Sequence, residues 1–151
     1  MKRILILIIA WAAMLPSLAQ QGLHIDQLFQ GRIVDQERII ETRVRGKSLE
    51  KYLLSYYRSV RMKVSAEECK QLSALLEKDK TNSIDMRSFR KNANSSKTYT
   101  CKLQLPAADG KNRYLCYQEQ WNKRHDLCEV TVIYMEGRVE SLEKLEVLLK
   151  K

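Results

Sequence analysis

Apolar and polar residues alternate along much of the chain, which is the pattern of strands with one buried face. The alternation is clearest in residues 97–105, where every second residue from Tyr99 to Leu105 is apolar or aromatic. The same period predicts strands at residues 38–45, 52–64, 112–118 and 127–135. Residues 83–89 have an ambiguous pattern, for which an edge strand is the one assignment considered. Arg58 interrupts the apolar face of the strand at 52–64.

Helices are predicted where the apolar spacing changes to three and four. Ser65 and Glu68 have the spacing of a capping box at the start of a helix over residues 65–78. Its inward stripe consists of Cys69, Leu72, Leu75 and Leu76. A short helix is expected at residues 23–30, and Ser141 is expected to cap a final leucine-rich helix.

The predicted order of elements is α-β-β-α-(β)-β-β-β-α, and hairpin neighbours imply antiparallel pairing. We therefore expect an α+β fold: an antiparallel sheet of about five strands with helices packed on one face. The other face would stay open to water, and it is the first place to look for a partner site.

The N-terminal segment fits a cleavable secretory signal. Lys2 and Arg3 precede an apolar run from Ile4 to Leu15, and small residues stand before Gln20. A membrane anchor is the competing interpretation, but a spanning helix needs roughly 20 apolar residues. We expect residues 1–19 to be the signal and 20–151 to form a single periplasmic or secreted domain, with no later segment long and apolar enough to span a bilayer.

The chain is basic. Its formal net charge is +9, and the predicted signal holds two basic and no acidic residues, so its removal leaves +7. An exported basic protein meets anionic envelope polymers, lipid head groups or acidic proteins rather than nucleic acid. The alternative is a mildly cationic solvated surface, since acidic and basic residues are interleaved.

No catalytic, cofactor or metal motif is complete. Gly46-Lys47-Ser48 ends like a phosphate-binding loop, but Glu41 stands where that motif needs glycine, so we expect a hairpin turn. His24 and His125 lie outside any metalloprotease motif. The four cysteines lack the paired spacing of a zinc site.

Four cysteines in an exported chain favour two disulfides. If the Asp109-Gly110 turn pairs Leu105 with Asn112, Cys101 lies opposite Cys116 and the two can bridge. Cys69 and Cys128 would then link a helix to the sheet, or would be two buried free thiols.

The loop after the strand predicted at residues 112–118 contains the best candidate contact residues. Trp121 lies there beside Lys123, Arg124 and His125, a set suited to an anionic glycan, a carboxylate or a protein partner. The competing interpretation is that Trp121 folds back as a plug over the end of the sheet.

Several segments resemble small exported domains of unknown function from gram-negative envelope bacteria. These segments are residues 21–25, 52–60, 112–115, 130–137 and 141–143. The resemblance implies an exported α+β domain and carries over no catalytic residue.

We therefore expect a non-catalytic binding or interaction module for a protein or glycan partner. The alternative is a small hydrolase or thiol enzyme that uses His125 and Cys128. A third class is a structural or inhibitory module that caps another protein.

Overall fold

The structure of the protein is a computed structural model that describes residues 22–125 and 127–150. The predicted signal at residues 1–19 lies outside the described residues. The helices are α2 (Asp26–Phe29), α3 (Ala66–Thr81) and α4 (Leu142–Leu149), with 3-10 turns η2 (Gln36–Arg38) and η3 (Lys47–Tyr52). The strands are β1 (Ile40–Arg45), β2 (Leu54–Val64), β3 (Asp85–Asn92), β4 (Ser96–Ala108), β5 (Lys111–Asn122) and β6 (Leu127–Gly137).

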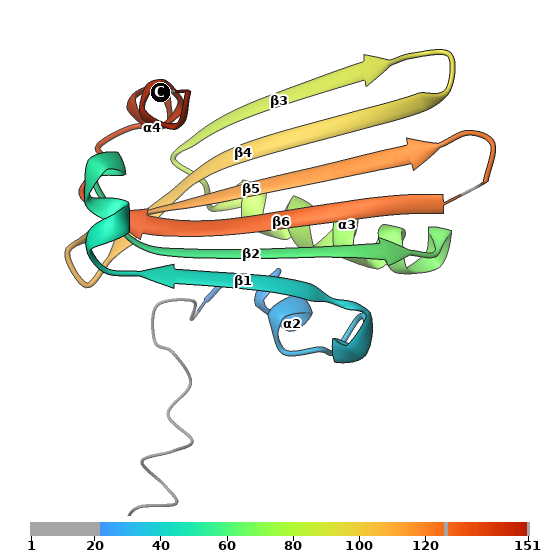
Figure 1. Ribbon diagram of the computed structural model, residues 1–151, viewed down its shortest axis with the longest axis horizontal. Coiled ribbons are helices and arrows are strands. Elements are labelled where there is room, and N and C mark those ends of the chain that lie inside the picture. The colour runs from blue at the N-terminus through green and yellow to red at the C-terminus, as the bar shows by residue number, and fades with distance from the viewer. Residues whose placement is uncertain (1–21, 126, 151) are drawn as a thin grey trace, which may run out of the picture.

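The strands form one antiparallel sheet of six strands in the order β1-β2-β6-β5-β4-β3 (Figure 1). The predicted α+β class with an antiparallel sheet is confirmed. The strand number was expected to be about five, and the sixth strand is β3, the ambiguous segment. It forms an edge of the sheet and pairs with β4 over its whole length. The Gly46-Lys47-Ser48 segment leads into the 3-10 turn η3 between β1 and β2 rather than forming a tight turn.

The main core lies between the sheet and α3, with α2 on its margin. The inward residues of α3 are buried as predicted, with Leu72 at 0% and Leu76 at 1% exposure. They belong to one cluster with strand residues that include Val60, Leu103, Tyr117 and Val132. Alternation along the strands therefore selects the face that α3 covers.

Helix α4 packs on the opposite face, so the expectation that all helices share one face is wrong. Leu142 and Leu145 of α4 cluster with Tyr114 of β5 and Met135 of β6. Tyr114 and Met135 are the sequence neighbours of Leu115 and Tyr134, which belong to the α3 core. Neighbouring residues of a strand point to opposite faces, so Tyr114 and Met135 point away from α3. The cause is that β5 and β6 carry apolar side chains on both faces near this end of the sheet, and both need cover.

The predicted helix caps are confirmed. The Ser65 hydroxyl accepts a hydrogen bond from the Glu68 N–H at 3.2 Å, and the Glu68 carboxylate accepts one from the Ser65 N–H at 3.0 Å. The Ser141 hydroxyl accepts from the Lys144 N–H at 3.2 Å. These bonds satisfy N–H groups that the first turn of a helix leaves unpaired.

Arg58 keeps its place on the buried face of β2 through its partners. Its side chain pairs with Glu41 of β1, and its guanidinium carbon lies 4.5 Å from the centre of the Phe29 ring. A buried cation is tolerated when an acidic and an aromatic group replace its water.

The β4–β5 hairpin corrects the predicted register. Asp109 and Gly110 have positive φ values of 52° and 73° and form the turn. The turn pairs Ala108 with Lys111, and a bulge at Pro106 and Ala107 then shifts the pairing by one, so Leu105 lies opposite Arg113; its predicted partner, Asn112, lies opposite the bulge. Proline cannot donate to the ladder, which explains the bulge at this position.

The register shift excludes the predicted bridge between Cys101 and Cys116. Cys101 pairs with Tyr117, and Cys116 pairs with Lys102. Side chains of adjacent positions point to opposite faces, so the two cysteines lie on opposite sides of the sheet.

None of the helices in the described part of the chain has the length and apolar character needed to cross a membrane.

Candidate binding site

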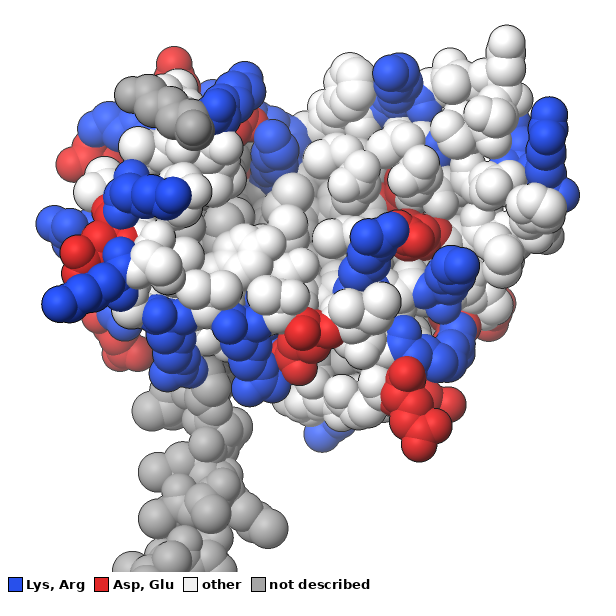
Figure 2. Space-filling model, in the orientation of Figure 1, with Lys and Arg blue, Asp and Glu red and all other residues white. Residues whose placement is uncertain are grey.

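The sheet face that α4 leaves uncovered forms a shallow trough, which we call the open face. It has a volume of about 440 Å³ and is lined by Tyr57, Ser59, Arg61, Gln118, Gln120, Glu129, Thr131 and Ile133. In Figure 2, which views this side of the sheet, a hollowed and largely uncharged centre is flanked by Lys and Arg side chains.

Three central strands place these groups. Thr131 of β6 lies between Arg61 of β2 and Gln118 of β5, so three polar side chains form one row across the sheet. Glu129 lies beside Gln120 in the next row on β6 and β5, and its carboxylate binds the Arg61 guanidinium at 2.7 Å. Amide and hydroxyl groups both donate and accept hydrogen bonds, so the floor can bind a ligand rich in hydroxyl groups.

The trough continues into a second hollow at the end of the sheet, with a volume of about 520 Å³. Arg61, Gln120 and Glu129 line both, which makes the two spaces continuous. The second hollow adds Lys63 and His125, so its basic groups exceed its acidic ones. This end of the open face therefore favours an anionic group.

Of the four predicted contact residues, two line the end hollow and two do not. Trp121 and His125 both line the end hollow, as their proximity in the sequence suggested. Trp121 lies on the α3 side of β5, half-buried, and packs against the core, so it also acts as the predicted plug.

Lys123 and Arg124 are not brought into the hollow. The Lys123 ammonium donates to the Asn92 side chain at 2.8 Å and to the Ala93 carbonyl at 2.6 Å, which holds the β3–β4 turn. Arg124 is exposed, and its backbone N–H donates to the Asn122 side chain at 2.9 Å.

A third hollow of about 360 Å³ lies on the α3 side of Trp121. Its lining includes Arg90, Lys97, Tyr99 and Glu119. The Arg90 guanidinium carbon is 4.4 Å from the centre of the Tyr99 ring, and burial raises the pKa of Tyr99. These residues were missed from the sequence, because the predicted register places Lys97 opposite Gln120, whereas the structure places it opposite Trp121.

The Cys69 and Cys128 sulfur atoms are in contact at 3.6 Å between α3 and β6. All four thiols are free in the structure. The hydrogen bond with Cys128 and burial both raise the pKa of Cys69, which keeps its thiol protonated. Burial also raises the pKa of Cys101 and of Cys116.

The structure does not support a catalytic pair of His125 and Cys128. His125 is exposed after β5, whereas the Cys128 side chain is fully buried against Cys69. Among the described residues, no group of three or more metal-ligating side chains comes together. His24 has a structural partner instead, because Asp79 accepts from the His24 N–H at 2.8 Å and contacts its ring nitrogen at 3.0 Å.

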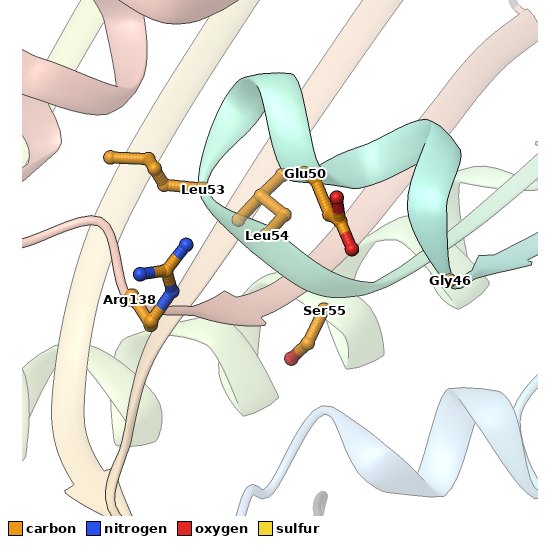
Figure 3. Close-up of a pocket in the computed structure, with 6 residues that line it drawn as sticks. All are labelled: Gly46, Glu50, Leu53, Leu54, Ser55 and Arg138. Carbon is orange, nitrogen blue, oxygen red and sulfur yellow. The ribbon is translucent and has the colours of Figure 1, made fainter.

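A further hollow of about 280 Å³ lies at the opposite end of β2, beside η3 (Figure 3). Glu50 and Arg138 extend toward it from two sides, and the Leu53 carbonyl accepts from the Arg138 N–H at 2.8 Å. One charge of each sign gives this hollow no preference for an anionic partner.

Comparisons with known proteins give a family but no activity. The model of a family described as "Family of unknown function (DUF6108)" matches residues 12–149. No curated protein matches the chain. The crystal structure of yhdA from Lactococcus lactis, whose description assigns it provisionally to the thioesterases, aligns at 12% identity with a TM-score of 0.23. That alignment covers 68% of this chain and 96% of the other, and its TM-score is too low to carry an argument.

Proposed function

The chain belongs to the DUF6108 family of unknown function, and from that premise we propose that it is an exported, non-catalytic module that binds an acidic glycan on its open face. The observation that carries the proposal is the polar floor of that face. Arg61, Gln118 and Thr131 present hydrogen-bonding groups in one row, on rigid strands at the centre of the sheet.

The chemistry of the floor favours a glycan over a protein. The centre of a protein interface is usually apolar and poor in charge. Here the trough is built from amide, hydroxyl and charged side chains, with Tyr57 and Ile133 at the end near α4. Sugar hydroxyl groups are matched by groups that both donate and accept hydrogen bonds.

The charge of the end hollow favours an acidic sugar. Arg61, Lys63 and His125 line it against the single carboxylate of Glu129. A glycan carboxylate or sulfate at this end would form charge-assisted hydrogen bonds. The signal pattern of residues 1–19 supports this assignment, because periplasmic and secreted proteins meet acidic polymers.

A thiol enzyme that uses His125 and Cys128 is the weaker candidate. A nucleophilic thiol must be accessible and able to ionise. Cys128 is 0% exposed, and its neighbour Cys69 has a raised pKa.

Calorimetric titration of residues 20–151 with oligosaccharides tests the proposal. We use oligogalacturonate as the acidic probe and malto-oligosaccharide as the neutral one. Lys63→Ala and Gln120→Ala should each weaken binding of the acidic probe about tenfold, since each removes about one hydrogen bond or ion pair. Lys70→Ala is the matched control, because Lys70 is exposed on α3 on the other side of the sheet.

Equal affinity of the Lys63→Ala, Gln120→Ala and unmodified proteins would remove the open face as the site. Absence of binding to both probes, together with capture of an envelope protein by cross-linking from position 120, would replace the glycan with a protein partner.

A further inference from the structure

The edge strand β3 is long and exposed, and an ion pair between Arg87 and Glu146 at 3.1 Å ties it to α4. It pairs with β4 without a shift over its eight residues, and all eight are exposed. It contains no proline, and its register shows no bulge. Natural edges usually carry such devices to prevent pairing with another chain.

Large apolar side chains also gather on this edge. Phe89 is 63% exposed, Met86 is 47% exposed, and Ile84, just before the strand, is 65% exposed. Asp85 and Arg87 lie between these apolar residues, and Arg90 and Lys91 follow Phe89. An exposed edge with apolar contacts and charges of both signs is suited to a specific partner strand.

The backbone groups that point away from β4 follow from the turn. The Ala93 N–H donates to the Ser96 carbonyl at 2.9 Å, so these two residues form a hydrogen-bonded pair. Bonded pairs recur at every second residue of an antiparallel ladder. Residues 91, 89, 87 and 85 therefore bond to β4, and Met86, Ser88 and Arg90 direct their N–H and C=O groups outward.

These outward groups restrict how two copies of β3 can pair. Two residues can form a hydrogen-bonded pair across the new interface only if the backbone N–H and C=O groups of both point outward. On β3 these are every second residue, so the two-fold axis of a symmetric pair passes through a residue and not between two residues. Centring on Arg87 or Arg90 places identical cations opposite each other. Centring on Phe89 places Arg87 opposite Lys91, which is also repulsive. Centring on Ser88 avoids all three conflicts.

The Ser88-centred register is also attractive. It places Asp85 opposite Lys91 of the second copy twice. It also places Arg87, which keeps its ion pair with Glu146 of its own chain, opposite the ring of Phe89 twice. The Asp85 carboxylate accepts from the Met86 N–H at 2.9 Å, so one outward N–H is occupied by a neighbouring side chain. In the paired state a carbonyl of the second strand takes that N–H, and Asp85 is released to bind Lys91.

We propose that two copies of this chain associate through antiparallel pairing of β3 with β3, centred on Ser88, and form one continuous sheet. This inference goes beyond the glycan-binding proposal and does not rest on it.

Sedimentation equilibrium of residues 20–151 tests the pairing by charge exchange. Lys91→Glu and Asp85→Lys should each raise the dimer dissociation constant about tenfold, because each replaces two attractive pairs by two repulsive ones. The protein with both changes has a lysine at position 85 opposite a glutamate at position 91 only if the strands pair in the Ser88-centred register. Its dimer dissociation constant should therefore return to within about threefold of the original. Lys47→Glu, an exposed residue of η3, is the matched control and should leave it unchanged.

Ser88→Pro provides a second test. It removes an outward N–H and no bond to β4, so it should abolish the dimer while circular dichroism shows the fold retained. A monomer at all concentrations up to about 1 mM, or a double charge variant as weak as the single ones, would overturn the proposal.

Discussion

At the scale of single residues, the four thiols form one pair in contact and one pair separated by the sheet. Cys69 and Cys128 touch at 3.6 Å inside the core, whereas Cys101 and Cys116 face opposite sides of the sheet. A disulfide requires the sulfur atoms to approach to about 2.05 Å, which a small rotation of two touching side chains can achieve and two faces of a sheet cannot. Only the first pair is suited to oxidation.

We predict that Cys69 and Cys128 become linked in protein recovered from an oxidising compartment, by exchange with an oxidised thiol partner. The bond would close a loop of 59 residues. For that length the chain-entropy model gives roughly 4 kcal/mol of stabilisation. Reductant should therefore lower the melting temperature, and Cys69→Ser should give the same low value with or without reductant.

A peptide map of non-reduced protein checks this directly. It should show residues 69 and 128 in one linked peptide and Cys101 and Cys116 as separate thiols. Cys116→Ser is the control and should leave the effect of reductant intact. An unlinked pair in protein recovered from that compartment would contradict the prediction.

At the scale of elements, helix α3 begins with bonds that combine local and long-range partners. Glu68 closes the capping box with Ser65 and also accepts two bonds from the Arg38 guanidinium, at 2.9 and 3.0 Å. The hydrogen bond from Arg38 lowers the pKa of Glu68 below its ordinary value of 4.5. The start of α3 therefore depends on the charge of one carboxylate.

We predict an acid-sensitive contribution from Glu68. Because its pKa is lower in the folded protein, its stabilisation is fully present above the unfolded value of 4.5 and is lost as the pH falls through the folded value. Urea unfolding at pH 7 and pH 3 should show a smaller acid loss for Glu68→Gln than for the original protein. Glu67→Gln is the neighbouring control in the same helical turn. An equal acid loss in Glu68→Gln would contradict this role.

The sequence predicts the elements better than their arrangement. Ser65 and Glu68 reveal the start of α3 because a capping box is a local interaction. The predicted hairpin register fails because the turn pairs Ala108 with Lys111, and the bulge at Pro106 and Ala107 then brings Leu105 opposite Arg113, one residue from its predicted partner. The face chosen by α4 was missed, although residues 130–135 are almost continuously apolar and so indicate a strand buried on both sides.

The same limit applies to the candidate site. Trp121 and His125 share a hollow, as their proximity in the sequence suggested. Arg61, Lys63 and Gln118 come from distant parts of the chain, and they meet only because β6 inserts between β2 and β5. No local pattern specifies that strand order.

At the scale of the whole molecule, the proposed pairing and the proposed glycan site fit one geometry. Antiparallel strands in one sheet are related by an axis perpendicular to that sheet, so both open faces of a dimer lie on the same side. A long polymer could then occupy two sites without a new contact. Linking two sites raises overall affinity through effective concentration.

We predict that the dimer binds long polygalacturonate at least tenfold more tightly, per site, than it binds a short oligomer that fills one trough. Ser88→Pro should remove this preference for length, because it breaks the pairing of β3 and lies outside the residues of the open face. Its affinity for the short oligomer should stay unchanged, whereas Lys63→Ala should weaken both ligands. Calorimetry with fractionated chains separates these outcomes. A Ser88→Pro protein that is monomeric and still prefers the long polymer would show that the preference arises within one open face.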